Sequence, residues 1–154
     1  MRLNLQTDFA LRVLMTLADR PDPAPTVRDL ADTLNLSNNH LMKIVAALRG
    51  AGWVQARRGR QGGIFLTIDP AQLTLRAVVE RFEGAHALVD CFGQGSSCTL
   101  LPTCRLKGTL QKALMAFYAE LDQKTLADMR TTNPEQRPSE PQGNRTSNCF
   151  DKSP

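Results

Sequence analysis

Two short helical patterns separated by a very short break constrain this fold more than any other feature. Apolar residues recur at helical spacing in residues 27–34 and again in residues 38–48, with a break at 35–36 between them. Thr26 and Ser37 stand where N-caps of the two helices are needed, because their hydroxyls can accept the free amides of a first helical turn. Two short helices joined by a tight turn predict a helix-turn-helix.

The sequence around this motif predicts the rest of a winged helix-turn-helix. Residues 53–56 and 64–68 have the composition of two β-strands, and the basic, glycine-rich residues 57–63 lie between them as a turn. Such a pair of strands is the wing. Helical patterns over about residues 7–17 and 75–82 supply a first and a fourth helix.

A longer amphipathic pattern begins at Arg105 and predicts one continuous helix as far as Met129. Its apolar stripe consists of Leu106, Leu110, Leu114, Phe117, Leu121, Leu126 and Met129. No other part of the chain is left to cover this stripe. A second copy of the chain is therefore the expected partner, in a two-fold homodimer.

The predicted fold class is mainly α with a small β wing, a winged helix-turn-helix domain plus a long dimerisation helix. We divide the chain into the DNA-binding domain (1–84), a cysteine-containing loop (85–104), the dimerisation helix (105–130) and a disordered tail (131–154) that is poor in apolar residues. No stretch approaches the roughly 18 uncharged apolar residues of a membrane helix, and residues 1–6 show no apolar region of the kind found in signal peptides. We expect a cytoplasmic protein with no membrane partner.

The charge distribution indicates a nucleic-acid partner. The formal net charge is only +4, but residues 33–68 contain no Asp or Glu. Asn and Lys at the start of a recognition helix can bond to base edges or phosphates of double-stranded DNA, although Asn also suits a helix start for conformational reasons. The candidate DNA-binding residues are Ser37, Asn38, Asn39, His40 and Lys43 in the motif, and Arg57, Arg58 and Arg60 in the wing.

Three of the four cysteines, Cys91, Cys98 and Cys104, lie within fourteen residues. In a reducing cytoplasm, clustered thiols indicate metal binding or redox sensing rather than disulfides. Intervals of six and five residues lack the tight knuckle of a structural zinc site and favour an iron-sulfur cluster. Zinc binding and thiol oxidation remain alternatives. Cys149 is a weaker candidate ligand because it lies in the predicted disordered tail. Nothing places a base beside a nucleophile, so we do not expect an enzyme.

The sequence resembles the Rrf-type winged-helix regulators, and within that family the nitric-oxide-sensitive repressors. The resemblance covers about residues 4–129. It rests on four motifs in order, TDFALR at 7–12, SNNHLMKIV at 37–45, RGRQGGI at 58–64 and CRLK at 104–107. Iron-sulfur regulators of a related branch carry a histidine three positions after the third cysteine, where this chain has Lys107. The first cysteine interval is one residue longer than the family pattern.

The resemblance implies a ligand set and a signal. Cys91, Cys98 and Cys104 would hold an iron-sulfur cluster, [4Fe-4S] or [2Fe-2S], with Asp8 of the partner subunit as the fourth ligand. The protein would repress transcription by binding operator DNA as a homodimer, and nitrosylation of the cluster by nitric oxide would release it. Judged from the residues alone, Asp8 is better explained by a favourable charge in a first helical turn, or by an ion pair with Arg12, than by a ligand role.

Overall fold

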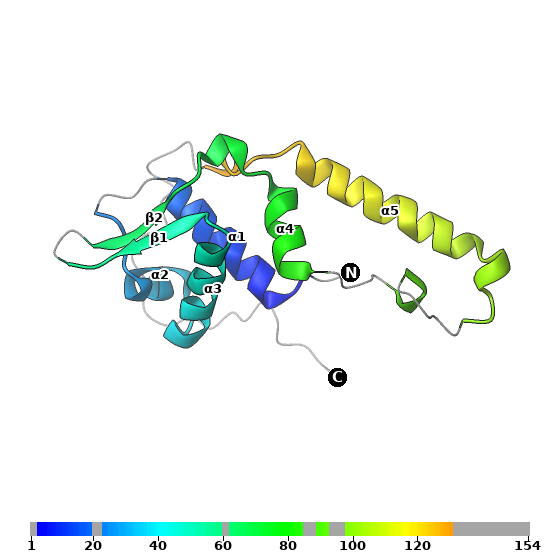
Figure 1. The fold of residues 1–154 in the computed structure, drawn as a ribbon, viewed down its shortest axis with the longest axis horizontal. Helices are drawn as coiled ribbons and strands as arrows, with labels where there is room; N and C mark the ends of the chain where they lie inside the picture. Colours follow the sequence, from blue (N-terminus) through cyan, green and yellow to red (C-terminus); the bar gives the residue numbers. More distant parts are fainter. Residues whose placement is uncertain (1–2, 20–22, 60–61, 85–88, 93–97, 131–154) are drawn as a thin grey trace.

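The computed structural model describes residues 3–19, 23–59, 62–84, 89–92 and 98–130. Their α-helices are α1 (Leu5–Ala18), α2 (Val27–Leu34), α3 (Asn38–Gly50), α4 (Leu75–Glu83) and α5 (Arg105–Asp122), and their strands are β1 (Val54–Arg57) and β2 (Gly63–Leu66). Figure 1 shows α1–α4 and the two strands as one body, from which α5 extends to one side. None of the described helices is long and apolar enough to cross a membrane.

The helix-turn-helix is confirmed, and its core is built from the predicted apolar faces. Leu14 of α1, Leu30 of α2 and Leu41 of α3 are completely buried in one cluster. The turn is tight because Asn35 adopts a left-handed conformation (φ 53°), which its short polar side chain tolerates. The amide of Leu36 then donates to the carbonyl of Ala31 at 2.9 Å and closes α2.

The wing is a two-stranded antiparallel sheet whose register runs from Val54 opposite Leu66 to Arg57 opposite Gly63. Gly63 has φ +153°, and a Cβ there would lie 2.6 Å from the carbonyl oxygen of Ala24. Only glycine permits that approach between β2 and the loop before α2. Strand β1 begins at Val54 and not at Trp53, whose amide donates to Leu48 at 3.1 Å at the end of α3, and β2 ends at Leu66 and not at Ile68.

The prediction of one continuous helix through Met129 is wrong. Helix α5 ends at Asp122, and the chain turns back onto the winged-helix body. Leu126, predicted to lie on the stripe that a second copy covers, is instead completely buried in the core cluster. Just before the short turn at Ala127–Met129, the Asp128 carboxylate accepts the amide of Thr125 at 2.7 Å and its hydroxyl at 2.9 Å.

Candidate functional site

Helix α3 presents its first residues and one long face to solvent. Ser37 accepts the amide of His40 at 3.3 Å, which confirms it as the N-cap. Leu41, Ile44 and Leu48 point into the core, so the opposite face is left free. The exposed residues of this face include Asn38, Asn39, His40, Met42 and Lys43. The structure thus brings the candidate residues of the motif together on one surface.

Met42 lies on this surface and was not among the predicted site residues. Its side chain is 60% exposed, between the polar Asn39 and Lys43. A long apolar side chain held in solvent on a recognition helix can contact the methyl group of thymine. The helical spacing of the buried residues Leu41 and Ile44 could have identified Met42, because position 42 must then face outward.

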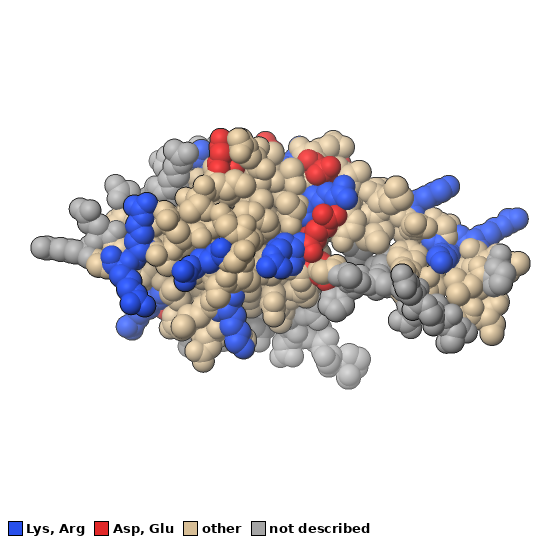
Figure 2. All heavy atoms as spheres, in the orientation of Figure 1, with Lys and Arg blue, Asp and Glu red and all other residues tan. Residues whose placement is uncertain are grey.

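The wing extends the same basic region. The Arg57 guanidinium lies over the ring of Phe65, 5.0 Å from its centroid, at a distance typical of a cation–π contact. Arg58 is exposed in the turn, and Arg60 lies outside the described residues. On the face drawn in Figure 2, Lys and Arg side chains lie over the wing, the winged-helix body and α5, and the acidic side chains lie along the upper edge and beside α4.

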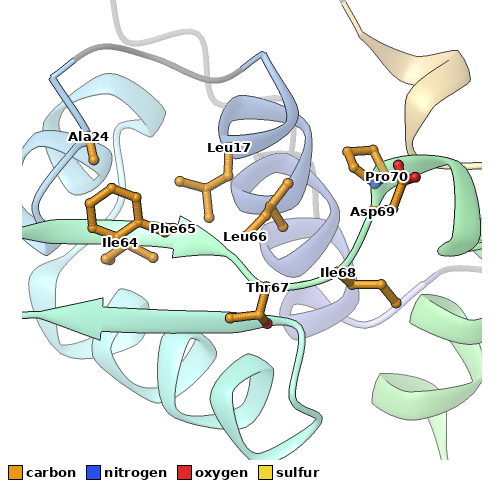
Figure 3. A pocket seen from close by; sticks show the side chains of 9 residues that line it. All are labelled: Leu17, Ala24, Ile64, Phe65, Leu66, Thr67, Ile68, Asp69 and Pro70. Carbon is orange, nitrogen blue, oxygen red and sulfur yellow. The ribbon is translucent and has the colours of Figure 1, made fainter.

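A hollow of about 550 Å³ lies between β2, the end of α1 and the strand's continuation to Pro70 (Figure 3). Its polar groups already serve the fold. The Thr67 hydroxyl donates to the carbonyl of Gly52, and Asp69 accepts the amide of Ala71 at 3.0 Å. With the rest of the lining largely apolar, this hollow offers no converging set of reactive groups.

The three clustered cysteines lie on the path between α4 and α5. Cys91 is half-buried in a short turn, Cys98 is exposed, and Cys104 is the half-buried residue directly before α5. None of the three is in a disulfide. Among the described residues of this single chain, no three His, Cys, Asp or Glu side chains gather closely enough to hold a metal ion. Cys149 lies outside the described residues.

Asp8 lies in the first turn of α1 and pairs with Arg12. Its Oδ2 is 2.8 Å from Nη2 of Arg12, and Oδ1 accepts from Nε at 3.2 Å. Oδ2 is shielded from solvent but accepts no hydrogen bond of good geometry within the described residues. The i,i+4 interpretation of Asp8 is therefore realised in the single chain.

A helix-turn-helix, a basic wing and a long appended helix define a winged-helix transcriptional regulator. The chain belongs to the Rrf2 family, described as iron-dependent transcriptional regulators, whose sequence profile matches residues 3–132. This confirms the resemblance found in the sequence.

Two relatives carry the same name, HTH-type transcriptional regulator NsrR. The chain is 40% identical to that of Bacillus subtilis (strain 168) over 131 residues, which cover 84% of this chain and 90% of the relative. It is 42% identical to that of Geobacillus kaustophilus, over 84% and 89% of the two chains.

Two solved structures share this fold. IscR of T. potens superposes with a TM-score of 0.67 at 24% identity, covering 84% of this chain and 85% of that one. CymR, the global cysteine regulator of B. subtilis, gives a TM-score of 0.64 at 25% identity, over 84% and 95% of the two chains. These likenesses confirm the winged-helix architecture.

Proposed function

We propose that this regulator is a cytoplasmic, nitric-oxide-responsive repressor that binds operator DNA as a homodimer and carries an iron-sulfur cluster. The proposed ligands are Cys91, Cys98 and Cys104 of one subunit and Asp8 of the partner subunit. The observation that carries this proposal is the similarity to the NsrR regulator of Bacillus subtilis over 84% of the chain. The family profile matches residues 3–132 and therefore extends well past Cys104.

The residues present suit a cluster chemically. Thiolates are the usual ligands of iron-sulfur clusters, and these three cysteines are not in disulfides. Cys104 precedes α5 without a side-chain cap, so the free amides and positive end of an 18-residue helix face its surroundings. That end favours the negative charge of a thiolate-ligated cluster. The Asp8 carboxylate, which pairs with Arg12 in the single chain, would exchange that ion pair for iron in the dimer.

A second copy of the chain is proposed to cover α5. This 18-residue helix has no fully buried residue, although Leu110, Leu114, Phe117 and Leu121 share one face at helical spacing. An apolar stripe of this length is stabilised by packing on an equivalent stripe across a two-fold axis. The same axis would present α1 of one subunit, with its Asp8, to the cysteines of the other.

The DNA-binding role is assigned to the surface of α3 and the wing. Asn38 and Asn39 are placed to bond to base edges, and Lys43 to a guanine or a phosphate. His40 and the Ser37 backbone lie beside them at the helix start. Arg57, Arg58 and Arg60 of the wing are proposed to contact phosphates or the minor groove.

Helix α5 offers a path from the cysteines to DNA. It begins directly after Cys104, and its other end is held to the winged-helix body by Leu126. Arg76 of α4 adds a second attachment, because its guanidinium lies 5.6 Å from the Tyr118 ring centroid and 3.7 Å from Asp122. Any rearrangement at the start of α5 therefore changes how two recognition helices are spaced across the dimer.

When bound, the cluster supplies iron atoms that react with nitric oxide. The contribution of the chain is to hold or release that site. Arg12 lies one turn along the same helix and would pair with the Asp8 carboxylate whenever no cluster is bound. The Asp8–Arg12 pair is thus the arrangement we assign to the cluster-free subunit.

Anaerobic purification tests the proposal. Wild-type protein should be brown, with visible absorbance and circular dichroism bands that change with nitric oxide, and should release duplex DNA selected from a random library. Cys98→Ser should abolish the colour, whereas Cys149→Ser, the control, should retain it. Protein that stays colourless after iron and sulfide are supplied, or that binds DNA equally before and after nitric oxide, would contradict it.

A second candidate is a regulator without a cluster, in which the same cysteines bind zinc or are oxidised by the signal. The observation in its favour is that these thiols do not gather as a ligand set within the described part of one chain. Colourless protein whose DNA binding follows zinc content or reversible thiol oxidation would establish this alternative.

A further inference from the structure

Glu83, the last residue of α4, holds the beginning of α1. Its Oε1 accepts the backbone amide of Asn4 at 2.9 Å and also the hydroxyl of Thr7. The Asn4 side chain returns a bond to the carbonyl of Phe82 at 2.9 Å. These contacts join segments almost 80 positions apart in the sequence.

The contacts fix the residue that precedes Asp8. Thr7 is completely buried, and it is the one buried polar residue of the described core. Its amide donates to Asn4 Oδ1 at 2.8 Å, and the amide of Asp8 donates to the carbonyl of Asn4 at 3.2 Å. The first turn of α1 is therefore set by Asn4, which Glu83 in turn holds.

Glu83 also lies shortly before the cysteines in the chain. Gly84 follows Glu83 and ends α4, and Cys91 lies seven positions later. The hydrogen bonds of Glu83 thus link the first turn of α1, which carries Asp8, to α4, the helix that precedes the cysteine segment.

We infer that Glu83 is a positioning residue for the cluster site. This inference rests on the proposed function. In the proposed two-fold dimer, each subunit supplies its Asp8 to the cluster site of its partner and its cysteines to its own cluster site. Glu83 connects these two parts of the same subunit. Glu83 holds the Asp8 carboxylate at the place where the partner's cysteines need it, and it connects the two cluster sites of the dimer.

A purely structural role predicts something different. If Glu83 only stabilised the fold, its removal would act whether or not Asp8 were present. If Glu83 acts through Asp8, its removal has no further effect once Asp8 is absent. A double-mutant cycle separates these cases.

The experiment uses reconstituted full-length protein and follows the loss of visible absorbance to the chelator EDTA under anaerobic conditions. The variants are Glu83→Gln, Asp8→Ala, the double variant, and Thr7→Val, which removes only the hydroxyl. Asp32→Asn is the matched control, since it neutralises an exposed carboxylate on α2. Melting of each apoprotein by far-ultraviolet circular dichroism shows whether it is folded.

Glu83→Gln should lose iron roughly two- to tenfold faster than wild type, because a neutral amide oxygen accepts the Asn4 amide and the Thr7 hydroxyl more weakly than a carboxylate does. Its visible circular dichroism should shift toward that of Asp8→Ala, and the double variant should be no faster than Asp8→Ala. Thr7→Val should show a smaller acceleration and decides the matter if Glu83→Gln does not fold.

The inference would be overturned if the accelerations of iron loss in Glu83→Gln and Asp8→Ala multiplied in the double variant. It would also be overturned if Glu83→Gln and Thr7→Val lost iron at the wild-type rate. Either result would leave the cluster proposal intact. Wild-type protein that cannot be made to hold a cluster would overturn both the inference and the cluster proposal. This outcome is measured on the wild-type protein alone.

Discussion

The amide of Leu126 donates a hydrogen bond to the carbonyl of Leu73 at 2.8 Å, and this bond closes the end of the long helix onto the winged-helix body. A reciprocal bond runs from the amide of Leu75 to the carbonyl of Lys124 at 2.9 Å. Together they form a bridge between Thr74 and Thr125. Helix α5 is thus anchored at its C-terminal end, while its N-terminal end carries Cys104.

Leu126→Ala should therefore destabilise the winged-helix body and not only α5. Leu126 is completely buried, so its truncation removes buried methyl groups and leaves a cavity. We expect the free energy of unfolding in urea to fall by roughly 2–5 kcal/mol. Met42→Ala is the control, because that side chain is 60% exposed and its loss should change stability by no more than about 0.5 kcal/mol. Equal stability of the two variants would show that the anchor does not form.

Leu114→Glu should dissociate the proposed dimer. Its side chain is on the unpartnered stripe of α5, and a charge placed between two such stripes has no compensating group. We expect the dimer dissociation constant in analytical ultracentrifugation to rise by at least about tenfold. Lys112→Glu introduces the same charge on the opposite face of the helix and should remain dimeric. A Leu114→Glu dimer of wild-type affinity would place the interface elsewhere.

The sequence predicted the helix-turn-helix because its signals are local. The spacing of buried residues and the caps at Thr26 and Ser37 all depend on neighbours within four positions, and both caps form as expected. The error after Asp122 has the same origin. Leu126 continues the apolar period of α5, but Asp128 accepts the amide of Thr125 as Asp29 accepts the amide of Thr26, and the chain turns at this point.

The candidate sites were predictable to different degrees. Ser37 to Lys43 lie on one surface because a single helix carries them. The cysteines are local in sequence, but a ligand set that includes Asp8 depends on how two chains meet, which no periodicity encodes. Glu83 was missed because its contacts with Asn4 and Thr7 span more than 75 positions. Only the packing of α4 against α1 reveals them.

Arg58→Ala and Arg60→Ala should each weaken DNA binding without changing sequence preference. Each phosphate contact that is lost should lower the slope of log affinity against log salt by about 0.9. The measurement is a salt titration with duplex DNA selected by the wild-type protein. Lys112→Ala, a cation on α5, should keep the wild-type slope. Wild-type slopes for both arginine variants would remove the wing from the interface.

Asp29→Asn should make the stability of the winged-helix body less dependent on pH. The pKa of Asp29 lies below its usual value of 3.8 because its carboxylate accepts the backbone amide of Thr26 and then the Thr26 hydroxyl, both at 2.8 Å. A depressed pKa in the folded state stabilises the protein above the unfolded-state pKa, and this contribution is lost as the pH falls through the folded value.

The stability difference between wild type and Asp29→Asn should therefore be greatest near neutral pH. There we expect roughly 0.3–1 kcal/mol at low ionic strength, toward the lower figure because the group is exposed and screened by solvent. The difference should shrink below about pH 4. Asp32→Asn, on the same helix but beyond its first turn, should show no such gap. A gap that persists in acid would mean that Asp29 stabilises α2 through packing and not through its charge, because protonation would then leave its contribution unchanged.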